Sequence, residues 1–142
     1  MEELLRLFTR AQKLMRAAVD EAMAPYGVRI GQNLLLEVLW REDGLAPGEL
    51  AARLGMATPT VVNTATRMEK AGLLERRPDP NDRRLVRLFL TGRGRAAEEP
   101  IQRARRRIAE FATATLSDSE RRHLETSLRK IVDQMSQGGP TA

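Results

Sequence analysis

Hydrophobic residues recur every three or four positions along most of the chain, which is the spacing of amphipathic helices. Helices are therefore predicted at residues 2–24, 30–41, 47–54, 58–72, 91–115 and 117–136. Residues 85–90 alternate instead, with Val86, Leu88 and Leu90 on one side and Arg87 opposite, so they predict a strand. A length of 142 residues suits one domain. The pattern predicts a mainly α (α+β) fold.

The predicted helix at residues 58–72 has a signal at each end and two different faces. Thr58 is expected to be its N-cap, with Pro59 at the first helical position. Gly72 suits the left-handed residue that ends a helix. The face expected to pack inward carries Val61, Ala65 and Met68. A second face carries Thr60, Asn63, Thr64 and Arg67.

This second face is unusual for a helix that only meets water, where paired Glu and Lys residues would be common. Short hydrogen-bonding side chains suit close approach to the edges of DNA bases. An Asn can bond adenine and an Arg can bond guanine, so Asn63 and Arg67 are candidates for reading sequence. For the helix taken alone, a plain polar surface is the alternative interpretation.

The segments on both sides of this helix favour DNA reading. Pro47 begins a short predicted helix, and residues 55–57 then form a Gly-containing turn, as in a helix-turn-helix. In that motif the second helix lies in the major groove. On the other side, the turn-forming residues 78–82 and the strand at 85–90 predict a hairpin with a basic tip.

The sequence GLLERRPDPNDRRLVRLFLTGRGR, residues 72–95, follows a helix that ends in RMEKAG. Together with ELAARLGM from Glu49 onward, it resembles the recognition helix and wing of the MarR family of bacterial transcription regulators. The resemblance implies a homodimeric winged helix-turn-helix protein, usually a repressor, whose affinity for its operator changes when a small molecule binds or a thiol is oxidised. It implies a DNA-binding lobe at about 30–90, an all-helical dimerisation lobe at about 1–25 and 92–136, and a flexible tail at 137–142.

The resemblance also implies which residues contact DNA. By position, Asp82 would orient Arg84 into the minor groove as a D-x-R pair, with Arg83 beside it near phosphates. The helix residues expected at DNA are Thr58, Thr60, Asn63, Thr64 and Arg67. The wing residues are Arg76, Arg77, Asn81, Asp82, Arg83 and Arg84. Apart from the resemblance, Arg87 also falls in the hairpin that would face DNA. Family members often have Thr-Arg or Ser-Arg where this chain has Val62 and Asn63, so the operator sequence is not predicted.

The remaining helices carry wide hydrophobic surfaces. The stripe of the first helix extends past one face, through Leu5, Leu7 and Leu14, which predicts both its own domain and a partner chain as neighbours. The second helix is expected to bury Ile30, Leu34, Leu35, Val38 and Leu39, with Leu36 and Trp40 on a further side. The last helix begins at a capping box of Ser117 and Glu120. Its hydrophobic face, with the spacing of a helix–helix contact, is formed by Leu124, Leu128, Ile131 and Met135. This face packs either against a partner chain or within its own chain.

The predicted helix at 91–115 has Thr91 as its N-cap and should be kinked by Pro100. Its basic run is either a phosphate-binding patch or a solvated face, and consists of Arg103, Arg105, Arg106 and Arg107. A net charge of +5 favours a polyanionic partner, although an Arg-rich composition also follows from a GC-rich genome.

Several classes of function are excluded by composition. With no cysteine, the chain has no disulfide, thiolate metal site or cysteine redox switch. The single histidine, His123, is expected at an exposed helix position, with a pH-sensitive contact in the dimer lobe as the alternative. The sequence has no phosphate loop and no metal-ligand spacing, so neither an enzyme nor a cofactor is predicted. Without a membrane span or signal peptide, a cytoplasmic protein is expected.

Together with the resemblance to the MarR family, the sequence predicts a homodimeric regulator, a repressor that binds double-stranded DNA at an inverted-repeat operator. A small effector would release it, and an anionic aromatic compound would suit Arg-lined walls with Trp40 nearby. The alternative is a constitutive or architectural DNA-binding protein of the same fold that has no ligand.

Overall fold

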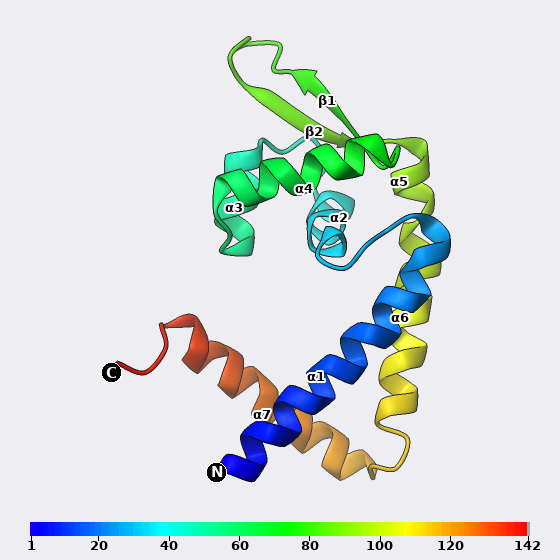
Figure 1. The fold of residues 1–142 in the computed structure, drawn as a ribbon, viewed down its shortest axis with the longest axis vertical. Helices are drawn as coiled ribbons and strands as arrows, with labels where there is room; N and C mark the ends of the chain where they lie inside the picture. The colour runs from blue at the N-terminus through cyan, green and yellow to red at the C-terminus, as the bar shows by residue number, and fades with distance from the viewer. Residues whose placement is uncertain (142) are drawn as a thin grey trace. The chain divides into compact units, whose positions relative to one another are not determined.

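A computed structural model describes residues 1–141 of the chain (Figure 1). It divides into two compact units, residues 1–108 and the residues from 109 onward, and each is described by itself. The elements of the first unit include α1 (Glu2–Met23), η1 (Ala24–Tyr26), α2 (Gln32–Arg41), α3 (Pro47–Leu54), α4 (Thr58–Lys70), β1 (Leu74–Pro78), β2 (Val86–Leu90) and α5 (Gly92–Ala96). The next helix, α6 (Glu98–Ala112), crosses the division, and α7 (Asp118–Ser136) lies in the second unit.

The core of the first unit lies between α2, α3, α4 and the hairpin formed by β1 and β2. Its most deeply buried side chains include Leu35, Leu36, Leu50, Val61, Met68, Leu73 and Leu88. The strands are antiparallel, with Leu74 opposite Leu90 and Pro78 opposite Val86. The hairpin continues from the end of α4, as Figure 1 shows. The predicted mainly helical fold with a two-stranded wing is confirmed.

The boundaries of α4 agree with the prediction at one end only. Its N-cap is Ala57, not Thr58, and the carbonyl of Ala57 accepts hydrogen bonds from the N–H groups of Thr60 and Val61. Thr58 and Pro59 therefore occupy the first two helical positions. Since the N–H groups of the whole first turn lack helical partners, Pro is tolerated at either place, and the sequence alone did not fix the register.

The other end of α4 is the predicted glycine stop. Gly72 has φ +78°, and its N–H donates to the carbonyl of Glu69 at 3.0 Å. The N–H of Leu73 donates to the carbonyl of Met68 at 2.9 Å. These two bonds form a Schellman motif, which satisfies carbonyls of the last turn and directs the chain into β1.

The second helix differs from its prediction. Gly31, with φ +89°, precedes α2, so the helix begins at Gln32 and Ile30 lies outside it. Its buried face is Leu35, Leu36 and Leu39. Leu34 is 42% exposed and Ile30 is 40% exposed, so the expectation that both pack inward was wrong.

The predicted helix at 91–115 is divided into α5 and α6, with the break at Ala97. Pro100 explains the position, because its ring clashes with the carbonyl four residues earlier and it has no N–H to donate there. The predicted kink is thus confirmed as a break. Thr91 is confirmed as the cap of α5, since its Oγ1 accepts a hydrogen bond from the Gly94 N–H at 3.1 Å.

The helices α1 and α7 both carry exposed apolar side chains. On α1, Leu4, Leu5, Leu7 and Leu14 are 48–67% exposed. On α7, Leu124, Leu128 and Ile131 are 40–41% exposed. The capping box of α7 is confirmed, because Ser117 Oγ accepts from the Glu120 N–H at 3.1 Å and the Ser117 N–H donates to Glu120 Oε1 at 3.0 Å.

The end of the chain is only partly described. His123 is exposed on α7, as predicted. Residues 137–141 follow α7 without regular secondary structure, and Ala142 of the predicted tail lies outside the described residues. None of the helices in the described range has the length and apolar character that crossing a membrane requires.

Candidate nucleic-acid interface

The two faces of α4 are separated as the sequence predicted. Val61, Ala65 and Met68 are at most 1% exposed and anchor the helix in the core. On the opposite side Thr58, Thr60, Asn63 and Arg67 are exposed, and Thr64 is partly exposed. The helix therefore presents a continuous edge of short polar side chains ending in one guanidinium. An edge of this kind can approach base edges without steric obstruction.

The wing tip carries the most exposed arginines of the hairpin. The Arg84 side chain is 95% exposed, and its backbone N–H donates to Asp82 Oδ1 at 3.0 Å. The same oxygen lies 3.6 Å from Arg84 Nε, so the structure brings the two residues of the expected D-x-R pair together. Arg83 and Asn81 are exposed beside them. This cluster is a small cationic surface at the end of the wing.

The two arginines of β1 have partners within the chain. Arg76 Nε lies 2.9 Å from Glu69 Oε2, and Arg76 Nη2 donates to Thr66 Oγ1 at 2.6 Å, which joins β1 to α4. Arg77 pairs with Glu75, and its guanidinium carbon lies 4.4 Å from the centre of the Phe89 ring. Contact of Arg76 and Arg77 with DNA stays a prediction, and it would require these exposed ion pairs to be shared with phosphates.

Arg87 was grouped with the arginines of the hairpin expected to face DNA, and the structure gives it partners within the chain. Its guanidinium turns toward the body of the winged domain, where Nε donates to Asp79 Oδ2 at 2.6 Å and Nη1 donates to the Gly44 carbonyl at 3.0 Å. Nη1 also lies 3.2 Å from Glu49 Oε1. Side-chain alternation placed Arg87 on the correct side of the strand. What that side meets depends on residues far away in the sequence.

Asp79 was missed by the sequence interpretation. It is 8% exposed, and its Oδ1 accepts hydrogen bonds from the N–H groups of Asn81 and Asp82 at 2.7 and 3.0 Å. The hydrogen bond from Arg87, followed by those from the backbone, holds the pKa of Asp79 below its usual value. The available signal was an Asp beginning a Pro- and Asn-containing turn, where its carboxylate can bond N–H groups two and three residues on.

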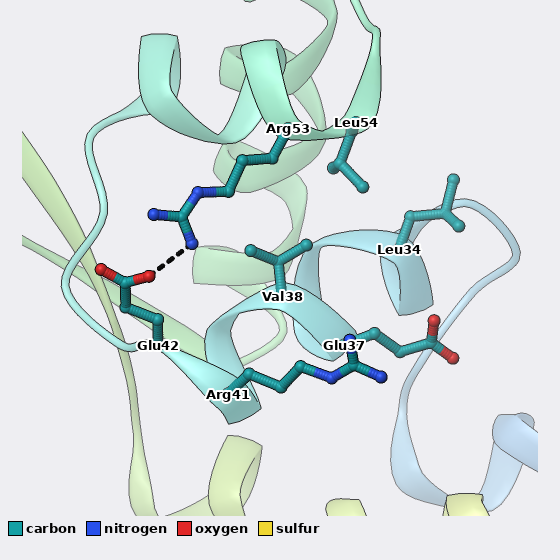
Figure 2. A pocket seen from close by; sticks show the side chains of 7 residues that line it. All are labelled: Leu34, Glu37, Val38, Arg41, Glu42, Arg53 and Leu54. Atoms are coloured by element: carbon teal, nitrogen blue, oxygen red, sulfur yellow. Dashed lines mark hydrogen bonds and ion pairs between the residues drawn. The ribbon is translucent and has the colours of Figure 1, made fainter. Parts of the chain in front are cut away.

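The hollows of the first unit include two that lie away from this surface. One, of about 390 Å³, is the groove between α2 and α3 shown in Figure 2, crossed by an ion pair of Arg53 and Glu42 at 2.5 Å. That ion pair lowers the pKa of Glu42. The other, of about 460 Å³, lies against α1, the start of α2 and α6, and is lined by Met15, Arg16, Val19, Ile30, Gly31, Asn33, Leu34 and Arg105.

Comparison with known proteins identifies the family. A model described as the MarR family matches residues 29–86. A putative transcriptional regulatory protein for the hcr operon of Thauera aromatica is 32% identical over 111 residues, which cover 78% of this chain and 67% of that protein. The chain belongs to the MarR family. The transcriptional repressor MprA of Escherichia coli strain K12 is 33% identical over 117 residues, covering 78% of this chain and 66% of MprA.

A solved structure agrees with this membership. The crystal structure of a mutant MarR from Escherichia coli in complex with operator DNA matches with a TM-score of 0.79 and 25% identity, covering 91% of this chain and 93% of that one. The chain spans 60–67% of the length of three curated relatives that it matches. These MarR relatives are named for transcription regulation, in agreement with the prediction that the chain is not an enzyme.

Proposed function

We propose that the protein is a homodimeric transcription regulator, a repressor that binds an inverted-repeat operator. The observation that carries this proposal is the exposed polar edge of α4 beside a hairpin whose tip bears Arg83 and Arg84. In a helix-turn-helix dimer, the second helix of each motif enters the major groove, one helical turn of DNA from its partner. The operator complex of the related MarR and the repressor name of MprA support the same function here.

Each part of the surface has a proposed role. Thr60, Asn63, Thr64 and Arg67 read bases, and Thr58 with the N-terminus of α4 binds phosphate. Arg83 and Arg84 enter the adjacent minor groove, with Asp82 orienting Arg84 and with Asn81 beside them. Arg76 and Arg77 lie along the flank of the hairpin and would share their ion pairs with phosphates. Double-stranded DNA carries closely spaced phosphates, so the +5 charge of the chain favours association at low salt.

The apolar stripes of α1 and α7 support the homodimer. Leu5 and Leu14 are 67% and 60% exposed, and Leu128 is 41% exposed. Large apolar surfaces of this kind are generally covered by a partner, and a second copy of the chain supplies the same stripes by symmetry. The dimer in turn supplies the second reading helix that an inverted repeat needs.

The DNA proposal is tested by measuring binding of purified variants to an operator duplex selected from a random library. R84A should weaken binding to all sequences and lower the slope of log affinity against log salt by about one. N63A should instead relax preference at one base position by about 1–3 kcal/mol. R6A, which removes an arginine of α1 that pairs with Glu2, is the control and should bind like wild type.

Three results would count against the proposal at different levels. Wild-type affinity and specificity in both R84A and N63A would show that α4 and the wing tip do not contact DNA. A monomeric wild-type protein that ignores duplex DNA at low ionic strength would refute the regulator itself. Continuous coverage of DNA in footprinting, without discrete inverted-repeat sites, would favour the architectural alternative.

The effector is proposed to be a small anionic aromatic compound bound in the 460 Å³ cavity. Arg16 offers positive charge there, whereas Arg105 is paired with Glu37, and Met15, Val19 and Leu34 offer apolar contact for a ring. To release DNA, the compound must bind one arrangement of the two α4 helices of the dimer better than the other. Thermal-shift and DNA-release measurements with benzoate and naphthoate, in wild type and R16Q, test this. If neither compound changed the Tm or the DNA affinity of either protein, this class of effector would be excluded.

A further inference from the structure

We propose that Arg87 is a positioning residue that fixes the wing tip, and with it Arg83 and Arg84, to the helix-turn-helix. This inference rests on the proposed DNA-binding function. It concerns a residue that the DNA does not touch, since the guanidinium of Arg87 is directed at three partners within the chain. Its contribution to binding would come from the place in which it holds the other two arginines.

Asp79 gives the wing loop its shape. Its Oδ1 accepts hydrogen bonds from the backbone N–H groups of Asn81 and Asp82, and its own N–H donates to the carbonyl of Leu85 at 2.8 Å. The carboxylate therefore lies inside the loop and organises the residues on which the D-x-R pair is built. The loop bonds and the strand pairing alone would still leave this loop at the end of a two-stranded ribbon. Such a ribbon is marginally stable by itself.

Arg87 joins that loop to the helix-turn-helix. Its Nε donates to the second oxygen of Asp79 at 2.6 Å, while Nη1 reaches the Gly44 carbonyl at 3.0 Å and Glu49 Oε1 at 3.2 Å. The same Glu49 oxygen accepts from the Ala46 N–H at the start of α3, at 3.4 Å. One planar guanidinium thus links the tip loop, the segment before α3 and the first turn of α3, a geometry that suits arginine.

The other links between β2 and the segment before α3 lie toward the base of the hairpin. The Leu88 N–H donates to the Leu45 carbonyl and the Leu90 N–H donates to Asp43 Oδ1, both at 2.9 Å. These bonds fix the C-terminal half of β2. Arg87 is the residue of β2 whose side chain extends the attachment to the loop, through Asp79.

Charge and exposure separate Arg87 from the arginines at the tip. The side chain of Arg87 is 30% exposed and meets two carboxylates, those of Asp79 and Glu49. Arg84 is 95% exposed and has the local partner Asp82 at 3.6 Å. A phosphate would have to displace short, charge-assisted hydrogen bonds to reach Arg87, whereas Arg84 is open to it. Arg87 therefore holds the wing tip in place, whereas Arg84 is available to contact DNA.

A double-mutant cycle tests this assignment with an operator duplex selected from a random library by the wild-type protein. R87M should lower affinity about tenfold or more, comparable to losing one charge-assisted hydrogen bond. In a background of R83A and R84A, which has no tip arginines left to misplace, R87M should cost less than about threefold. R95M is the control, because it also removes an ion pair to the segment before α3, that of Arg95 with Asp43, without touching the tip.

The outcomes separate position from direct contact. Equal losses from R87M in both backgrounds would mean that Arg87 contacts DNA itself, and would overturn the inference while leaving the proposed function intact. Wild-type affinity in R87M would overturn it as well. A wild-type protein that binds no duplex would overturn the proposed function and this inference together.

R87K keeps the experiment informative if R87M unfolds the hairpin. Lysine retains the charge but lacks the planar fork, so it cannot reach Asp79, Gly44 and Glu49 together. The expected result is an intermediate loss of affinity in the wild-type background and faster hydrogen exchange at the Asn81 and Asp82 amides, again with little loss in the background of R83A and R84A. Wild-type affinity and exchange in R87K would show that charge alone is sufficient, and would refute the positioning role.

Discussion

Gly94 is predicted to be a position where no side chain is tolerated. It is buried in α5, and a Cβ added there would lie 2.3 Å from the Leu73 carbonyl oxygen and 3.3 Å from Leu90 Cδ2. The Leu73 oxygen is held in place because it accepts a hydrogen bond from the Thr91 N–H at 3.1 Å. The Gly94 carbonyl accepts from Trp40 Nε1 at 2.9 Å. In G94A the backbone of α5 must move away from the base of the hairpin.

The size of the effect follows from opposing contributions. Replacing Gly by Ala in a helix favours folding by up to about 1 kcal/mol. Overpacking against a fixed carbonyl costs about 1–3 kcal/mol. Displacement of α5 also weakens the Trp40 hydrogen bond, worth about 1 kcal/mol, and the Thr91 cap, worth about another. The clash and the lost bonds outweigh the helix propensity, so G94A should destabilise the protein by about 2 kcal/mol, or roughly 4–8 °C in Tm.

G92A is the matched control for this prediction. It makes the same substitution two residues earlier in the same helix, where an added Cβ meets no atom within 4 Å. Its expected effect is neutral or stabilising, by up to about 1 kcal/mol, through the unfolded chain. Denaturant and thermal unfolding of both variants, at one protein concentration, make the comparison. If G94A were as stable as G92A, the close packing of α5 on the hairpin would be refuted.

Three further predictions concern single side chains. The pKa of Asp79 is lowered in the folded protein, so its carboxylate stabilises the fold above its ordinary pKa of about 3.9 and loses this effect as pH falls through the folded value. The difference in Tm between wild type and D79N should therefore be largest at neutral pH and shrink below about pH 4, and a constant difference would contradict it. L128K should weaken self-association more than about tenfold in analytical ultracentrifugation, because it places an unpaired charge in an apolar seam, whereas T126K should have little effect. S117A should cost about 1 kcal/mol and speed hydrogen exchange at the Glu120 amide, and unchanged exchange would deny the cap a role.

Local signals predicted the elements that carry the candidate site. The bounds of α3, the glycine stop of α4 and the caps of α5 and α7 all depend on residues within one turn of each other. The buried face of α4 follows from helical spacing alone, because Val61, Ala65 and Met68 share one side. These features need no knowledge of the rest of the fold. That DNA meets the opposite face stays a prediction from the sequence.

Features that depend on distant residues were not predictable in the same way. The partners of Arg87 come from three separate segments, at Gly44, Glu49 and Asp79, so the period of the strand could not reveal them. The start of α2 depends on the positive φ of Gly31, and Leu34 lies on the exposed side of the helix. A glycine in the sequence permits such a conformation without requiring it.

The exposed leucines on α1 and α7 would make the stability of the protein depend on its concentration if a second copy covers them. If two copies cover those stripes, the free energy of unfolding rises with protein concentration, because association draws on the folded form only. At low protein concentration the subunits would then be monomeric. They would have a lower free energy of unfolding and could not span the two half-sites of an operator. The cellular concentration of the protein would then set how steeply transcription of its target genes changes.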